Sequence, residues 1–146
     1  MDGTFGITTT HSPKVSAALL AIRIASALAF LYHGAAITFG AFGGPGPEKF
    51  AAFTHMPLVA AYFVGLAQLA GGLAMLTGVL IRVGAVCIII VMLGAIFLVH
   101  LPHGFDIGHG GIEYALTQLL VAFAILLTGP GAYSLAGFLP PSLRRL

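Results

Sequence analysis

Charged residues are scarce in this chain. Asp, Glu, Lys and Arg make up 7% of its 146 residues, whereas a soluble domain carries about 25%. Hydrophobic residues make up 59%, and the mean hydropathy is +1.06. So few charges cannot cover a globular surface with groups that water solvates. We therefore expect lipid to cover most of the surface of an integral membrane protein with a single domain.

Cysteines and basic clusters are also few. The single cysteine, Cys87, lies inside an apolar run, which excludes an internal disulfide and a cysteine-based metal site. The net charge is +2, and no cluster of Lys and Arg is interleaved with aromatic residues. This composition excludes a nucleic acid as a partner.

Four apolar stretches are present, at about 15–37, 57–80, 83–101 and 112–128. Each has roughly the 17–25 residues that a helix needs to cross the hydrocarbon layer. Backbone groups in lipid must bond within their own segment, so the stretches should be helices. The first run is too long for a signal peptide and lacks a basic start, so we expect it to be retained. The sequence thus predicts an all-α, antiparallel four-helix membrane bundle over 14–135, with a flexible tail at 1–13 and a second tail at 136–146.

Basic residues predict the orientation of this bundle. With four spans, both termini share a side with the turn at Ile81 and Arg82. That side carries Lys14, Arg82, Arg144 and Arg145, and the other side carries only Lys49. The positive-inside rule then places both termini in the cytoplasm. The Gly- and Pro-rich loop 38–56 and the loop 102–111 face outward, and we expect residues 39–49 to form a rigid turn over the bundle mouth.

Small residues predict which helix faces pack, because helices in lipid associate through close backbone approach. In the first helix they recur every four residues and lead to His33, which would face the bundle at its outer end. In the second helix, Gln68 shares a face with such residues. The two stripes are Ala17, Ala21, Ala25 and Ala29, and Ala61, Gly65 and Gly72.

Polar residues within the apolar runs need an explanation. Arg23 either snorkels to the cytoplasmic surface or faces an anionic headgroup, a quinone carbonyl or a partner subunit. His33 either bonds to a nearby backbone carbonyl or serves as a ligand or proton donor in an outward-facing pocket. Gln68 either joins helices through its amide or contacts a bound ligand.

The stretch from Val99 to Tyr114 concentrates titratable side chains between two apolar runs. His100, His103, His109 and Glu113 form an H-x2-H-x5-H-x3-E pattern. Imidazole and carboxylate groups bind Zn, Cu, Fe or Mn, so these four would hold a metal or haem if one is present. Two other interpretations are a histidine cluster that transfers protons at the membrane face and simple surface polarity. Glu113 either interacts with the helix dipole or pairs with His33 or His100.

At these residues the chain resembles the DoxX family of small four-helix bacterial membrane proteins. The resemblance runs from about residue 21 to 135, and it departs at Gln68, where members often carry Glu, and at 36–38, where they often carry Lys. It implies the bacterial inner membrane, crossed several times, and a link to redox complexes, since the family name comes from association with a thiosulfate:quinone oxidoreductase. The matching positions are Arg23, His33-Gly34, 42–46, 71–72, Gly78, Arg82, Ala95, 100–102, 104–105, Gly111, Glu113-Tyr114, 129–131 and 133–135.

We therefore expect a membrane subunit of a quinone-linked oxidoreductase with a polar pocket at the outer face. The expected catalytic residues, which would bond the quinone carbonyls and move protons, are His33, His100 and Glu113. The expected cofactor-binding residues are Arg23, Gln68, His103 and Tyr114. The alternatives are a non-catalytic anchor or assembly subunit and a histidine-ligated metal or haem protein. The expected partners are lipid and either other subunits of a redox complex or further copies of the chain; whether the chain is an enzyme by itself stays open.

Overall fold

The computed structural model describes residues 11–140, 142 and 143, which are mainly helical and include no strand. The helices are α1 (Pro13–Phe39), α2 (Gly46–Thr54), α3 (Leu58–Thr77), α4 (Ile81–Ala95) and α5 (Glu113–Thr128). A π-helical turn, Ile96–His100, continues α4. Short 3-10 turns lie at Ala41–Gly43, Leu101–His103, Ile107–His109 and Leu135–Phe138.

Helix ends follow local sequence signals. The Ser12 hydroxyl accepts a hydrogen bond from the Val15 N–H, and Pro13 occupies the first turn of α1, two features that favour helix initiation. Helix α1 ends at Gly40 and α3 at Gly78, both in a left-handed conformation that glycine adopts without steric cost.

Helices α1, α3 and α5 follow their predicted apolar stretches to within three residues, and α4 does so when its π-helical turn to His100 is included. Residues 46–54 lie in the expected loop 38–56 and overlap the end of the expected rigid turn 39–49, but they form helix α2. Pro47 in its first turn and Glu48 beside it favour a helix start. The expected tail 1–13 lies mostly outside the described residues. Arg144 and Arg145, two of the basic residues that predict the orientation, also lie outside them.

The lengths and apolar composition of three helical segments suit a membrane crossing. They are Pro13–Phe39, Leu58–Thr77 and Ile81–His103, with 27, 20 and 23 residues, whereas α5 is shorter, with 16. The fold is thus that of a helical membrane protein. The four-span bundle and its cytoplasmic termini stay predictions, because they require that α5 also crosses.

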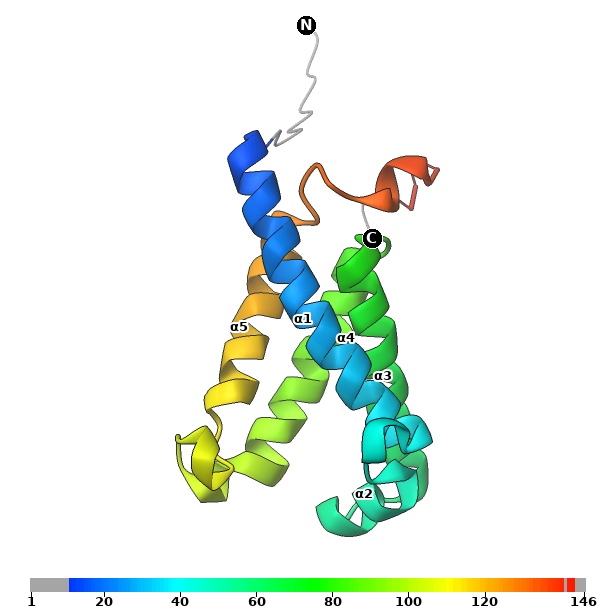
Figure 1. Ribbon diagram of the computed structural model, residues 1–146, viewed down its shortest axis with the longest axis vertical. Coiled ribbons are helices and arrows are strands. Elements are labelled where there is room, and N and C mark those ends of the chain that lie inside the picture. The colour runs from blue at the N-terminus through cyan, green and yellow to red at the C-terminus, as the bar shows by residue number, and fades with distance from the viewer. Residues whose placement is uncertain (1–10, 141, 144–146) are drawn as a thin grey trace, which may run out of the picture.

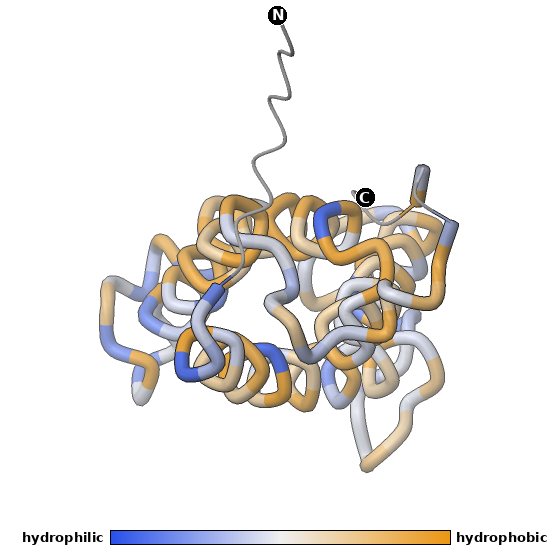
Figure 2. The backbone as a smooth tube through the Cα atoms, turned by 90° about the horizontal axis from the view of Figure 1, so that it is seen from above, coloured by the Kyte–Doolittle hydropathy of each residue, from blue (hydrophilic) through white to orange (hydrophobic). Residues whose placement is uncertain are grey.

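The helices lie side by side, with α1 against α3, α3 against α4 and α4 against α5 (Figure 1). The start of α1, the α3–α4 turn and the segment after α5 gather at one end, which we call the terminal end. The end of α1, α2 and the loop 101–112 gather at the opposite end, the histidine end (Figure 1). Hydrophobic residues run through every helix in the view along the bundle (Figure 2).

Glycines allow α3 to approach α1 and α4 closely. A Cβ atom on Gly34 would lie 2.8 Å from the Leu69 nitrogen and 2.9 Å from the Gly65 carbonyl oxygen, and one on Gly84 would lie 2.3 Å from the Ala74 Cβ. Backbones in these two interfaces therefore touch, as expected for helices in lipid.

The predicted packing face of α1 is wrong, whereas that of α3 is confirmed. Ala17, Ala21 and Ala25 are exposed, and the buried face of α1 instead carries Arg23 and Ser26. Alanine gains little by leaving lipid, but polar groups must find partners inside the protein, and this need sets the rotation of the helix. On α3 the predicted residues are all buried, namely Ala61, Gly65, Gln68 and Gly72.

Candidate functional site

Arg23 is fully buried and all of its bonds go to backbone carbonyls. Its Nε donates to the Met75 oxygen (2.8 Å) and its Nη2 to the Leu76 oxygen (3.2 Å). Its Nη1 donates to the Pro130 and Tyr133 oxygens, each at 2.8 Å. Met75 and Leu76 lie at the end of α3, where carbonyls lack helical partners. The snorkelling interpretation is therefore wrong, because the guanidinium is bonded inside the protein.

Gly78 and Ser134 complete this arrangement, which we call the Arg23 clamp. A Cβ on Gly78 would lie 2.8 Å from Arg23 Nη2, so only glycine leaves room for the guanidinium. The Ser134 hydroxyl donates to the Gly78 oxygen (3.2 Å). Arg23 precedes His33 by ten residues, about 15 Å along the helix axis. The structure thus does not bring Arg23 into one site with His33.

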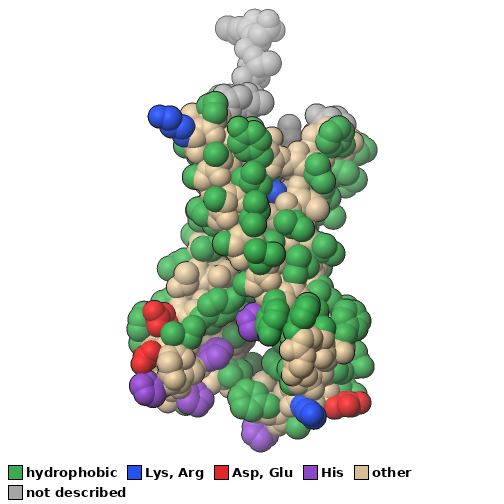
Figure 3. Space-filling view, viewed as in Figure 1, with side chains coloured by type: hydrophobic (Ala, Val, Ile, Leu, Met, Phe, Trp, Pro, Cys, Tyr) green, Lys and Arg blue, Asp and Glu red, His purple; other side chains and the backbone are tan. Residues whose placement is uncertain are grey.

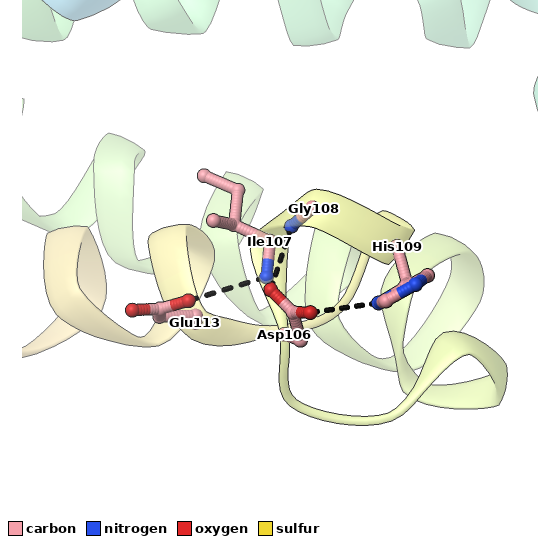
Figure 4. A network of polar contacts seen from close by, with 5 residues as sticks. All are labelled: Asp106, Ile107, Gly108, His109 and Glu113. Atoms are coloured by element: carbon pink, nitrogen blue, oxygen red, sulfur yellow. Dashed lines mark hydrogen bonds and ion pairs between the residues drawn. The ribbon is translucent and has the colours of Figure 1, made fainter.

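The side chains of the loop 101–112 mostly bond within the loop (Figure 4). The Asp106 carboxylate accepts the Gly108 N–H (2.8 Å) and pairs with His109 Nδ1 (2.7 Å). Glu113 accepts the Ile107 N–H (3.2 Å). These contacts fix the loop to itself and to the first turn of α5.

His100 and His103 are held in the same way. His100 donates from Nδ1 to the Gly110 oxygen (2.6 Å), and His103 donates from Nδ1 to the Val99 oxygen (3.0 Å). Across the described residues, no three His, Cys, Asp or Glu side chains lie close enough to hold a metal ion. The structure therefore does not assemble His100, His103, His109 and Glu113 as a ligand set.

His33 meets Tyr114 across the bundle, at the histidine end. Their ring centroids are 6.0 Å apart, and His33 also contacts the neighbouring Tyr32 edge-on at 5.4 Å. In the described part of the chain, no hydrogen bond joins His33 to His100 or Glu113, so the expected catalytic trio is not linked. Figure 3 shows histidine side chains around a hollow at this end of the molecule.

Two buried hydroxyls at this end have no hydrogen-bond partner within the described residues, those of Tyr114 and Thr38. Gln68 is 5% exposed, and we find no hydrogen bond from its amide to any described residue. The expected bond between helices through Gln68 is thus not formed. Gly34, the neighbour of His33, lies against Gly65 and Leu69 on α3. Gln68 lies between these two residues in the sequence, so it is at about the same height along the helices as His33.

Sequence reasoning missed a polar contact between α1 and α5. The Ser26 hydroxyl donates to the Gln118 side-chain oxygen at 2.7 Å. Gln118 follows Tyr114 by one turn, and Ser26 precedes His33 by about two turns. These spacings are visible in the sequence, but they indicate a shared site only once α1 and α5 are known to face each other.

A match to a known protein family covers the chain from α1 to the π-helical turn after α4. A family model described as DoxX matches residues 18–101, which include Arg23, His33, Gln68 and His100 and end before Glu113 and Tyr114. No curated protein and no solved structure matches the chain significantly. Because the family match spans more than half of the 146 residues, the chain belongs to the DoxX family.

Proposed function

We propose that this chain is a membrane subunit of a quinone-linked redox system and binds a quinone head at the histidine end, between His33 and Tyr114. The observation that carries the proposal is the buried Tyr114 hydroxyl, which has no hydrogen-bond partner among the described residues. Leaving such a group unbonded costs about 1–3 kcal/mol, so it calls for an explanation. A quinone carbonyl accepts a hydrogen bond from a phenol and would supply the missing partner.

His33 gives the site its second polar group. Its imidazole is exposed and lies 6.0 Å from the Tyr114 ring. A neutral imidazole has one ring nitrogen that donates a hydrogen bond and one that accepts. It can thus bond a quinone oxygen and exchange a proton with it. The quinone tail would lie among the exposed apolar side chains of the helices, in lipid.

His100 and Glu113 would pass protons between this site and water. Each uses one polar atom to hold the loop, Nδ1 in His100 and Oε2 in Glu113, which leaves His100 Nε2 and Glu113 Oε1 for exchange. Gln68, at the level of His33, is a further candidate to contact the ligand. Arg23 is left out of the site, because its donors bond the carbonyls of the clamp. In this proposal the histidine end faces the outer side of a bacterial inner membrane.

The test is equilibrium binding of decylubiquinone to the purified chain in lipid nanodiscs, with empty discs subtracted. We expect saturable binding that Tyr114→Phe and His33→Ala each weaken about tenfold, the effect of one lost hydrogen bond. Tyr62→Phe, at an exposed tyrosine on α3, is the matched control and should bind normally. Absence of saturable binding by the unmodified chain, or unchanged affinity in Tyr114→Phe, would contradict the proposal.

A non-catalytic anchor subunit is the second candidate. The observation that favours it is the self-contained loop 101–112, whose side chains bond locally and need no ligand. Purification from native membranes in mild detergent tests it, since an anchor should elute with other chains. A lone, monodisperse protein would count against an anchor role, whereas quinone binding in the nanodisc assay would favour the first candidate.

A further inference from the structure

The face that α1 presents to α5 differs from the face that it presents to α3. Toward α3, Gly34 brings the backbones into contact. Toward α5, two contacts are made by side chains, the Ser26–Gln118 hydrogen bond at 2.7 Å and the His33–Tyr114 ring contact at 6.0 Å. We call this line of contact the α1–α5 seam. A seam held by side chains can admit a ligand without separating two backbones.

The two seam contacts follow the antiparallel course of the helices. His33 and Tyr114 meet at the histidine end, and Ser26 and Gln118 meet deeper in the bundle. Tyr114 and Gln118 are four residues apart on α5, so they share one face and are separated by about 6 Å along the axis. That separation is comparable to the distance between the two oxygens on opposite sides of a quinone ring.

Ser26 fixes which end of the Gln118 amide is available. The Ser26 hydroxyl donates to Gln118 Oε1, so the amide oxygen is occupied. No described residue accepts a hydrogen bond from the Gln118 NH2 group. Ser26 itself is 2% exposed, which prevents it from turning away to water. The seam therefore presents two donors that bond no described acceptor, the Tyr114 hydroxyl and, one turn deeper, the Gln118 amide.

We infer that Gln118 is the second hydrogen-bond donor of the quinone site and that Ser26 is the positioning residue that orients it. The inner quinone carbonyl accepts from Gln118 Nε2, and the outer carbonyl accepts from the Tyr114 hydroxyl. This inference rests on the proposed function and adds a specificity to it, namely for a ring with two carbonyls on opposite sides.

Two ligands in the nanodisc assay test this pairing. One is decylubiquinone, with two ring carbonyls, and the other is a decyl-tailed cyclohexenone, with one. Gln118→Met keeps the length of the side chain but lacks the amide. We expect it to weaken decylubiquinone binding about tenfold and to leave cyclohexenone binding unchanged. Tyr114→Phe should weaken the binding of both ligands, because the single carbonyl also bonds the outer donor.

Ser26→Ala separates orientation from direct contact. It keeps the Gln118 amide but releases its oxygen, so we expect a smaller loss of decylubiquinone affinity, about threefold, and none for the cyclohexenone. Thr117→Val, at an exposed neighbour on α5, is the matched control and should change neither. Thermal melting verifies that each variant is folded, and Ser26→Ala carries the test if Gln118→Met does not fold.

The outcomes distinguish this inference from the proposed function. If decylubiquinone binds and Tyr114→Phe weakens it while Gln118→Met and Ser26→Ala do not, the two-carbonyl inference is wrong and the proposed function stands. If Gln118→Met weakens both ligands equally, Gln118 does not select the second carbonyl, and the inference is again wrong. If the unmodified chain binds neither ligand, the proposed function itself fails.

Discussion

At the terminal end, hydrogen bonds join elements that are far apart in the sequence, whereas at the histidine end they close on the loop that carries them. Arg23 bonds carbonyls 52–110 residues away, and the buried Ser16 accepts the Ala132 N–H across 116 residues. The bonds of His100, His103, Asp106 and the Glu113 carboxylate span only 2–10 residues.

This difference indicates which end is cross-linked by hydrogen bonds between helices and which end can change conformation more easily. The terminal end ties α1, α3 and the segment after α5 into one unit through the four hydrogen bonds of Arg23. The histidine end leaves the Tyr114 and Thr38 hydroxyls without partners in the described region. Regions with few bonds between elements open at a lower free energy than cross-linked ones. A ligand site at the histidine end can therefore form without disturbing the clamp.

Removing the clamp should have the largest effect. Arg23→Met keeps an apolar side chain of similar length but leaves four carbonyls in the bundle without their donor. We expect a loss of about 3 kcal/mol or more in the free energy of unfolding, measured as a lower melting temperature in detergent. Lys14→Met, at an exposed position at the start of α1, is the control and should melt normally. Equal melting temperatures for the two variants would show that the clamp does not stabilise the terminal end.

The second prediction concerns what holds the histidine end, where bonds between elements are few. We expect backbone packing of α1 on α3 to replace them. Gly34→Ala would place a Cβ 2.8 Å from the backbone nitrogen of Leu69, so the helices must separate, at a cost of about 1–3 kcal/mol. Gly94→Ala is the matched control, because nothing lies within 4 Å of the added Cβ and alanine favours a helix. A Gly34→Ala variant as stable as Gly94→Ala would exclude backbone packing as the support.

Much of the architecture could be predicted from the sequence, because the length of an apolar run determines whether a helix can cross a membrane. The course of α1, α3, α4 and α5 followed from that rule. The α1 packing face did not, since small residues permit contact without requiring it, and the burial of Arg23 and Ser26 decided the rotation. Helix α2 was missed because the glycines and prolines around it dominated the pattern.

The site was harder to predict than the fold. The partners of Arg23 are backbone carbonyls, which leave no trace in the sequence. The density of titratable residues in 99–114 drew attention to His100, His103 and Glu113, but these groups bond their own loop. The more informative pair is Tyr114 and Gln118, whose four-residue spacing gains meaning only when α1 is known to lie opposite.

Replacing Tyr114 by Phe sharpens the comparison between the two ends. The hydroxyl has no partner among the described residues. Its removal should therefore leave the free energy of unfolding unchanged or raise it by up to about 1 kcal/mol. At the terminal end, Ser134→Ala removes the bond to the Gly78 oxygen and the bond from the Ala136 N–H and should cost about 1 kcal/mol or more. Melting curves without quinone check both variants. A clear loss of stability in Tyr114→Phe would mean that the hydroxyl already has a partner.

The smallest effect is expected from His109→Ala. Its ion pair with Asp106 is short, at 2.7 Å, but the two side chains are 82% and 61% exposed, and water screens such pairs so well that they contribute little. The melting temperature should therefore not change. Hydrogen exchange measured by mass spectrometry supplies the complementary test, since only peptides covering 102–112 should exchange faster and those covering 129–134 should not. Faster exchange at the terminal end would show that the loop is coupled to the clamp, which would contradict the independence of the two ends.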